Sequence, residues 1–430
     1  MAFMQITSTN PKFSMIMCKN PASGMIAKRI RKGVAYGYYT KGREDQYNVF
    51  FQDDYDEISF SKYENQEFEY LDSTRYNSPL FVFSAVKEFA NSALKKQLEN
   101  DTEGFDNTVI ISSFASKKMD LVTHLFEYFP DYNITTTPVG ALAWKIEIKT
   151  KKTIYELLNF VYLLSVMAAA ISDLNLVMDE GLLTRTVAAM NICKAPYYVR
   201  YIGRLKLCTS KSFFLKVRED LQKVPGHTVE FSDSITNQAS RIEAVMKSLP
   251  EEMDIVDVGC GEGNFLHLAT KIGEHTYHAI DIDPDAIDHI QKRAAKKKIE
   301  NIAFYNSVDE FFELSDSHDS DYAVMMNEVI EHQEKDQVYE FIHRFIEDKN
   351  CKLIIITTPN KDFNKNYLLK ENELRNPDHK FEFTRQEFKE FFELLTNLEV
   401  IVTTEYIGDK VDDESTTFMA IITKKGEEFK

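Results

Sequence analysis

Cysteine is scarce in this sequence, and its spacing argues against two kinds of protein. The 430 residues include 5 cysteines, an odd number, and no two of them have the CxxC spacing typical of zinc sites and redox motifs. A secreted domain held together by disulfide bonds would use paired cysteines. We therefore predict reduced thiols in a cytoplasmic protein. The five positions are Cys18, Cys193, Cys208, Cys260 and Cys351.

The sequence also lacks the hydrophobic segments that membrane insertion requires. Its first residues, MAFMQITSTN, contain no basic start followed by an apolar run, so we expect no signal peptide. The longest apolar stretch, residues 159–172, is shorter than the roughly 20 residues that span a bilayer and predicts a buried helix. No internal repeat or low-complexity tract is present. We therefore expect no association with a membrane.

Positive charge is scarce in the second half of the chain. Residues 1–250 contain 30 Lys and Arg against 28 Asp and Glu, so this half is nearly neutral. Residues 251–430 contain 21 against 40, a net charge of −19. Such a half cannot attract a nucleic acid through a broad positive field. It would need a local basic patch, a metal ion, or a partner that brings the substrate.

Hydrophobic residues, by contrast, are abundant enough to form large cores. They make up 43% of the chain, aromatic residues make up 12%, and the length predicts two or three domains. Residues 1–225 mix predicted strands (108–114 and 141–150) with predicted helices (79–98 and 153–172), which indicates an α+β domain. A polar stretch at 223–238 predicts a linker, which we place at 226–236, before a second domain at 237–430.

From about residue 240, apolar segments of strand length alternate with helices. This pattern predicts an α/β fold with a parallel sheet covered on both faces, a Rossmann-like arrangement. One helix is expected directly after the glycine-rich segment at 257–265, and another within the motif MNEVIEHQ at 326–333. The predicted strands are 254–259, 277–282, 302–306, 321–327 and 352–358.

A glycine-rich turn follows the first of these strands. The segment DVGCGEGNF contains Gly259, Gly261 and Gly263, and glycine lets a ligand approach the backbone closely. Asp281 ends the next strand 20 residues after Gly261, where a carboxylate can accept hydrogen bonds from both ribose hydroxyls of an adenosine. Asp257, at the strand end, would face the amino-acid portion of the ligand. Because no Lys-Ser/Thr follows the loop, we predict S-adenosylmethionine rather than a nucleotide phosphate.

The motif MNEVIEHQ places Glu328, Glu331 and His332 at i, i+3 and i+4, on one face of a helix. Such a cluster is usually a solvated face. Its position after a predicted parallel strand favours a ligand site, because ligands bind at that edge of the sheet. His379, in a loop before a predicted helix with a capping box at 384–387, adds a second imidazole. Mixed carboxylate and imidazole ligands favour Mn²⁺ or Mg²⁺ over zinc. Rival ligands are His318, Gln333 and His343.

Six motifs in this order closely resemble the RNA 3′-terminal 2′-O-methyltransferases. This family includes the eukaryotic small-RNA methyltransferases and a bacterial RNA-repair branch. The resemblance covers about residues 237–430, and the pairing of NEVIEH with the motif around His379 is highly specific. The stretch 70–89 is similar, more loosely, to the N-terminal domain of the bacterial branch. The motifs are DVGCGEGNF, AIDID, YNSV, NEVIEH, TTPNKDFN and LRNPDHKFEFT.

The resemblance implies a methyltransferase sheet, one divalent metal ion (Mn²⁺ or Mg²⁺) and S-adenosylmethionine as methyl donor. It implies that the protein methylates the 2′-hydroxyl at RNA 3′ ends, together with a polynucleotide kinase–phosphatase–ligase that the N-terminal domain activates. The implied metal ligands are Glu328, Glu331, His332 and His379. The implied cofactor contacts are the Gly259–Gly263 loop, Asp281 and Ser307.

His332 or His379 would assist deprotonation of the hydroxyl, although an imidazole bound to a metal ion is a hindered base. Phe383 stands where the family usually has tryptophan. The alternative functions are a small-molecule O-methyltransferase with a catechol-like substrate and a non-catalytic scaffold that activates the ligase.

Overall fold

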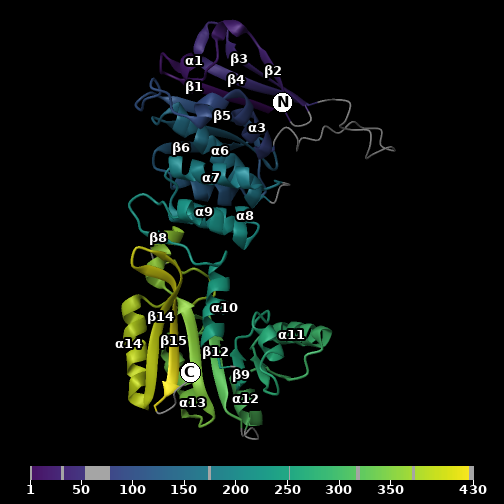
Figure 1. Cartoon of the computed structure of the whole chain (residues 1–430), viewed down its shortest axis with the longest axis vertical. Coiled ribbons are helices and arrows are strands. Elements are labelled where there is room, and N and C mark those ends of the chain that lie inside the picture. The colour runs from purple at the N-terminus through teal and green to yellow at the C-terminus, as the bar shows by residue number, and fades with distance from the viewer. Residues whose placement is uncertain are drawn as a thin grey trace, which may run out of the picture. The chain divides into compact units, whose positions relative to one another are not determined.

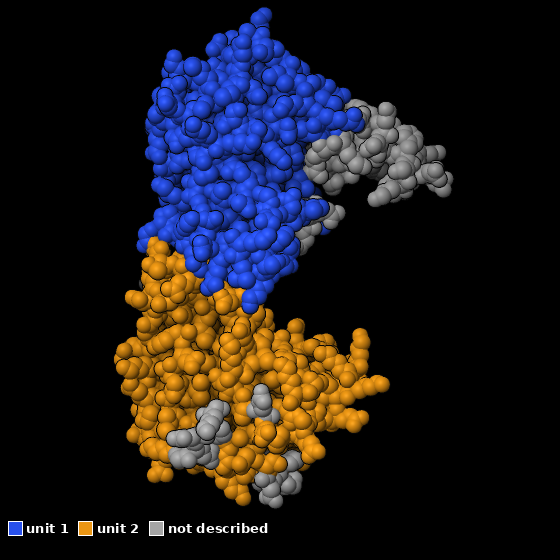
Figure 2. Space-filling model, viewed as in Figure 1, with its two compact units in different colours: residues 1–226 blue, residues 227–430 orange. Residues whose placement is uncertain are grey.

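The chain folds into two compact units. The computed structural model describes residues 2–30, 33–53, 78–172, 176–250, 252–315, 320–369 and 373–425. Unit 1 comprises residues 1–226 and unit 2 comprises residues 227–430 (Figures 1 and 2). Each unit has its own sheet, and each is described separately below.

Unit 1 is built on an antiparallel sheet with the strand order β2-β3-β4-β1-β5-β7-β6. Burial alternates along its strands, so one face packs on helices and the other faces solvent, which is typical of antiparallel sheets. The strands are β1 (Ala2–Ser8), β2 (Ile26–Ile30), β3 (Gly33–Thr40), β4 (Arg43–Asp53), β5 (Asn107–Ala115), β6 (Tyr132–Pro138) and β7 (Ala143–Thr150). The helices are α1 (Phe13–Ile16), α3 (Pro79–Phe89), α4 (Asn91–Lys95), α5 (Met119–Glu127), α6 (Ile154–Ile171), α7 (Glu180–Ile192), α8 (Tyr197–Leu207) and α9 (Lys211–Leu221).

The predicted helix at 153–172 is confirmed as α6. Thr153 and Glu156 form a capping box at its start, and both carboxylate oxygens of Asp101 accept backbone hydrogen bonds from its first turn. With 18 residues, α6 is long and apolar enough to cross a bilayer, so the argument from length fails. The helix is nevertheless 83% buried within the described chain, as expected for the central helix of a folded domain.

Unit 2 has a mixed sheet with the order β11-β10-β9-β12-β13-β15-β14-β8. The first five of these strands are parallel, which confirms the predicted α/β fold, and the last three pair antiparallel. The strands are β8 (Val229–Glu230), β9 (Asp254–Val258), β10 (Tyr277–Ile280), β11 (Ile302–Tyr305), β12 (Tyr322–Asn327), β13 (Cys351–Pro359), β14 (Val400–Val411) and β15 (Glu414–Lys424).

Helices cover both faces of this sheet. Neighbouring residues Ile255 and Val256 of β9 belong to separate apolar cores, one on each side. One core includes residues of α12 (Val308–Ser315), α13 (Lys335–Glu347) and α14 (Arg385–Leu395). The other includes residues of α10 (Asn237–Ser248), the 3₁₀ helix η3 (Leu266–Thr270) and α11 (Pro284–Lys297). The remaining short helices are η4 (Ile330–His332), η5 (Lys361–Tyr367) and η6 (Thr396–Leu398).

Strand order brings the predicted site segments together. The strands β11, β10, β9 and β12 are successive neighbours in the parallel part of the sheet. The segments that follow their carboxyl ends contain Ser307, Asp281, Gly259 and Glu328 respectively. All four segments therefore lie along one edge of the sheet, the edge at which ligands bind in such folds.

Part of the predicted linker, 226–236, belongs to unit 2. Its residues Val229–Glu230 form β8, which pairs with β14. Phe231 is only 1% exposed, and the backbone N–H of Thr228 donates to Asp412 over 3.0 Å.

We therefore expect a piece comprising residues 227–430 to be more stable than one comprising 237–430. Loss of β8 and of the buried Phe231 side chain costs roughly 3 kcal/mol or more by analogy with Phe-to-Ala substitutions in cores. Urea unfolding of both pieces, followed by circular dichroism, measures this difference. Equal unfolding midpoints would show that the segment 227–236 contributes nothing to unit 2.

Candidate cofactor and metal site

The glycine-rich turn adopts a conformation that depends on glycine. Gly259, Gly261 and Gly263 have φ values of +69°, +47° and +73°, in the region that side chains disfavour. The backbone N–H groups of Gly259 and Cys260 both donate to the carbonyl of Ile280, over 2.8 and 3.0 Å, which fixes the turn against the end of β10. The prediction of an α-helix directly after this turn is wrong. The chain instead makes further turns and then the short 3₁₀ helix η3.

Asp281 is placed as the sequence predicts, beside this turn. One of its carboxylate oxygens accepts from the N–H of Gly261 over 2.7 Å, and the other accepts from the N–H of Asp283 over 2.9 Å. A carboxylate has about four acceptor sites, so two are left for the hydroxyls of a ribose. The same hydrogen bonds fix the carboxylate relative to the turn.

Asp257 is buried at the end of β9, and its pKa is raised to about 7. Burial raises it most, a hydrogen bond from the Tyr277 hydroxyl opposes the rise, and the negative charge of Asp281 adds to it. Ser307 has a local role, since its hydroxyl accepts from the N–H of Glu310 over 3.0 Å in the first turn of α12. Contact between Ser307 and a cofactor stays a prediction.

The motif MNEVIEHQ does not form the expected α-helix. Strand β12 ends at Asn327, Glu328 has a φ of +58°, and Ile330–His332 forms one turn of 3₁₀ helix before α13 begins at Lys335. A left-handed residue at Glu328 breaks the helical path, so the i, i+3, i+4 spacing does not bring the three side chains onto one face. Such a backbone outlier on a charged residue is typical of functional sites.

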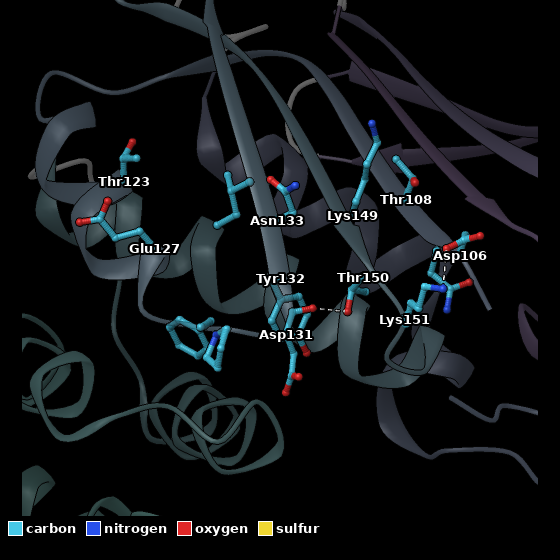
Figure 3. Close-up of a pocket in the computed structure, with 14 residues that line it drawn as sticks. Asp106, Thr108, Thr123, Glu127, Asp131, Tyr132, Asn133, Lys149, Thr150 and Lys151 are labelled. Carbon is cyan, nitrogen blue, oxygen red and sulfur yellow. Dashed lines mark hydrogen bonds and ion pairs between the residues drawn. The ribbon is translucent and has the colours of Figure 1, made fainter. Parts of the chain in front are cut away.

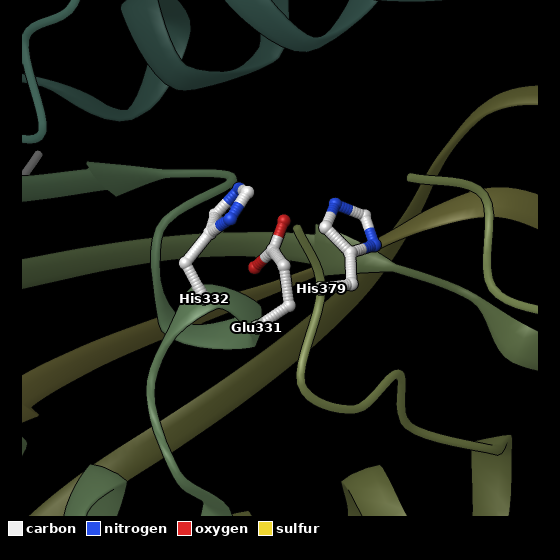
Figure 4. Close-up of side chains that lie close together, drawn as sticks. All are labelled: Glu331, His332 and His379. Atoms are coloured by element: carbon white, nitrogen blue, oxygen red, sulfur yellow. The ribbon is translucent and has the colours of Figure 1, made fainter. Parts of the chain in front are cut away.

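Tertiary folding nevertheless brings both imidazoles to one of the carboxylates. One donor atom of each of Glu331, His332 and His379 lies within 4.8 Å of the others, and Figure 4 shows the three side chains directed toward a common space. The two imidazole rings are 4.9 Å apart and nearly perpendicular. The N–H of Lys380 donates to the carbonyl of Glu331 over 2.8 Å, which ties the loop of His379 to η4.

Glu331 is the carboxylate of this cluster whose burial is most costly. Its side chain is fully buried; one carboxylate oxygen accepts from the Thr358 hydroxyl over 3.1 Å, and the other has no hydrogen-bond partner. Burial, followed by the nearby charge of Glu328, raises the pKa of Glu331 well above its usual value. A cation next to the unpartnered oxygen would relieve this cost.

Glu328 lies outside this three-residue group. One of its oxygens is 3.6 Å from a guanidinium nitrogen of Arg241, on α10, and its other oxygen is buried without a hydrogen bond. Its negative charge contributes, after burial, to the raised pKa of Glu331. Arg241 was not identified from the sequence, because a single arginine on a helix before the glycine-rich turn carries no recognisable motif.

Of the rival ligands, His343 does not join the cluster. His343, on α13, forms an ion pair with Glu347 at 3.5 Å. Gln333 as a ligand stays a prediction, and His318 lies outside the described residues. Phe383 is fully buried in the apolar core of unit 2, so its side chain is not available to stack on a substrate.

A cavity of about 790 Å³ lies in unit 1, at the ends of β5, β6 and β7 (Figure 3). It contains none of the predicted site residues. Its charged side chains include Lys151 and Asp106, which form an ion pair at 3.8 Å. Nothing in this cavity indicates a second site for the predicted chemistry.

Comparison with known proteins identifies the family. Residues 3–225, more than half of the chain, match the family model described as the Hen1 N-terminal domain. The chain belongs to the Hen1 family. Residues 249–410 of this Hen1-family protein match a methyltransferase domain, which implies S-adenosylmethionine as the cofactor. The predicted family and fold class are thus confirmed.

Individual relatives agree with this assignment. The chain is 31% identical over 175 residues to the small RNA 2′-O-methyltransferase of Arabidopsis thaliana. The matched region covers 35% of this chain and 18% of that protein. It is 33% identical over 153 residues to the enzyme of the same name from Drosophila melanogaster, covering 31% of this chain and 38% of that one. A chain in the structure of the Pnkp1/Rnl/Hen1 RNA repair complex has the same fold, with a TM-score of 0.77, 22% identity, and coverage of 98% of this chain and 100% of that one. The chain thus spans well under half the length of these two curated relatives.

Proposed function

We propose that this Hen1-family protein transfers a methyl group from S-adenosylmethionine to the 2′-oxygen of the 3′-terminal ribose of RNA. One observation supports this most: the cofactor turn packs closely against Val329, the residue directly before the 3₁₀ turn that carries Glu331 and His332. A Cβ added at Gly259 would lie 2.6 Å from a methyl group of Val329, which is located between Glu328 and η4. A methyl donor and a site for hydroxyl groups are therefore adjacent.

The donor set fits a divalent cation, Mn²⁺ or Mg²⁺. Glu331, His332 and His379 would hold it, and Glu328 is a further carboxylate whose charge acts on Glu331. Glu328 and Glu331 each have one buried oxygen with no partner, which is the condition a bound cation would satisfy. When bound, the ion would lower the pKa of a ribose hydroxyl, as metal ions lower that of water by several units.

A cation held by the cluster would favour a terminal ribose over an internal one. The 2′- and 3′-hydroxyls of the last nucleotide present two adjacent oxygens, whereas an internal ribose has no free 3′-hydroxyl. Glu331 and Glu328 would supply negative charge to hold the cation. Asp281 and the glycine turn would orient the methyl donor, S-adenosylmethionine.

RNA that ends in a 3′-phosphate or a 2′-deoxyribose should not be methylated. The phosphate removes one of the two adjacent hydroxyls, and the deoxyribose lacks the acceptor oxygen. The measurement is methyl transfer from labelled S-adenosylmethionine to matched oligonucleotides in the presence of Mn²⁺, with a 3′-hydroxyl RNA as the positive control. Equal labelling of the 3′-phosphate RNA would indicate an internal ribose as substrate. Labelling of a catechol but not of RNA would indicate a small-molecule enzyme.

We further propose that the protein acts in the cytoplasm in RNA repair, together with a polynucleotide kinase–phosphatase–ligase. The support is the fold match over nearly the whole chain with a component of the Pnkp1/Rnl/Hen1 complex. Residues 1–226 alone should then stimulate RNA sealing by the partner ligase and show no methyl transfer. A sealing assay with and without this piece tests the idea, with residues 227–430 as the matched control. Unchanged sealing would remove the activating role of unit 1.

A further inference from the structure

His379 is held by a buried carboxylate that lies outside the predicted ligand set. Its ring atom Nδ1 is 2.7 Å from an oxygen of Glu382, whose side chain is completely buried. By contrast, among the residues that the structure describes, the ring nitrogens of His332 have no hydrogen-bond partner, and its ring contact is with His379. The two imidazoles are thus held very differently.

Among the described residues, the other groups hydrogen-bonded to the Glu382 carboxylate are also donors. The side-chain amide of Asn364 donates to Oε2 over 2.6 Å, and the N–H of Arg375 donates to Oε1 over 2.8 Å. Both oxygens of this carboxylate thus accept hydrogen bonds from N–H donors. An ionised carboxylate only accepts hydrogen bonds. The hydrogen between the two side chains therefore belongs to Nδ1 of His379.

Glu382 is in turn fixed by a closed set of hydrogen bonds. The Nε–H of Arg375 donates to the amide oxygen of Asn364 over 2.6 Å, which orients the amide so that its NH₂ group faces Glu382. The same guanidinium donates to the carbonyl of Thr416 over 2.7 Å and to the carbonyl of Asn360. These carbonyls belong to β15 and to the residue after β13, so the sheet itself anchors the set.

We propose that Arg375, Asn364 and Glu382 form a positioning relay that holds His379 as the Nδ1–H tautomer and leaves Nε2 as its metal-binding atom. The metal part of this inference rests on the proposed function. A histidine ligand normally donates its second ring N–H to an outer partner, which sets the tautomer and orients the ring.

The relay predicts a change of tautomer that is independent of metal and of catalysis. In the metal-free full-length protein with ¹⁵N-labelled histidines, NMR above the usual imidazole pKa should show His379 with its hydrogen on Nδ1. Glu382→Gln should lose this preference, because the new NH₂ group meets only donors around it. The His379 signals are assigned with His379→Gln.

Variants of the relay residues should also bind the metal ion more weakly. Mn²⁺ binding, followed by electron paramagnetic resonance, should weaken about 10- to 100-fold in Glu382→Gln, as is typical when an outer partner of a ligand is removed. Asn364→Ala should show a smaller loss. Binding of S-adenosylhomocysteine should be unchanged in both variants, because the cofactor turn is not part of the relay.

Glu387→Gln is the matched control, since it makes the same substitution five residues away. Glu387 completes the capping box of α14 and does not contact His379. This control should lower the unfolding temperature and leave the His379 tautomer and Mn²⁺ affinity unchanged. If Glu382→Gln does not fold, Asn364→Ala provides the same two readouts.

Two failures can be told apart. If Glu382→Gln keeps the Nδ1–H tautomer of His379 and the wild-type Mn²⁺ affinity, the proposed relay is wrong. A wild-type protein that shows the fixed tautomer but binds no Mn²⁺ overturns the metal site of the proposed function, and with it the assignment of Nε2 as a ligand.

Discussion

Glu331→Gln should reduce methyl transfer at least about 1000-fold while cofactor binding survives. The substitution keeps the shape of the side chain and its contact with Thr358, but it removes the charge of the most deeply buried predicted ligand. Metal-assisted activation of a hydroxyl is worth several kcal/mol, and each 1.4 kcal/mol is a factor of ten in rate. Methylation assays beside calorimetry with S-adenosylhomocysteine measure the two effects separately.

The same substitution should stabilise the metal-free protein, which distinguishes loss of a ligand from loss of the fold. The folded-state pKa of Glu331 is raised, so as pH rises above the unfolded-state pKa of about 4.3 the unfolded chain ionises first and the folded state loses stability. A glutamine side chain does not ionise, so its burial brings no such pH-dependent loss of stability. In EDTA near neutral pH, Glu331→Gln should therefore unfold at a higher temperature than the wild type, and this gain should shrink toward pH 4.

Glu334→Gln is the control for this experiment, because Glu334 is exposed and lies three residues from Glu331. It should change neither the rate nor the unfolding temperature appreciably. Near-normal methylation by Glu331→Gln would exclude Glu331 as a metal ligand. Loss of both methylation and cofactor binding, with a lower unfolding temperature, would mean that Glu331 is required for the fold instead.

Gly259→Ala should weaken the binding of both cofactor and metal. The added Cβ would lie 2.6 Å from the side chain of Val329, and a φ of +69° disfavours any residue with a Cβ. The turn must move away from β10 or push Val329 outward, and Val329 lies directly before η4, which carries Glu331 and His332. We expect at least about tenfold weaker binding of S-adenosylhomocysteine, equivalent to about 1.4 kcal/mol, and a measurable loss of Mn²⁺ affinity.

Gly273→Ala separates backbone strain from this contact. Gly273 also has a positive φ, +63°, but no atom would lie within 4 Å of the new Cβ. This control should lower stability by roughly 1 kcal/mol and leave both affinities unchanged. If Gly259→Ala weakens the cofactor alone, the turn and the metal segment are independent, and the contact with Val329 has no role in coupling them.

The sequence by itself determined the local chemistry of this protein. Strand and helix periodicity predicted the parallel sheet of unit 2, and the rule that ligands bind at the carboxyl edge of such a sheet placed Asp281 beside the glycine turn, as the structure has it. The capping box at Thr384 was also predictable, because a cap involves only residues that are close together in the chain. Local spacing specifies such features directly.

Only the tertiary structure decided how the side chains of the cluster meet. A helical spacing placed Glu328 with Glu331 and His332, but the positive φ of Glu328 interrupts the helix and leaves its carboxylate beside Arg241. His379 reaches Glu331 through a backbone hydrogen bond between distant segments, and neither periodicity nor a cap can specify such a contact. The relay behind His379 has the same cause: Asn364 lies in η5, whereas Arg375 and Glu382 lie in the segment before α14, and tertiary hydrogen bonds bring them together.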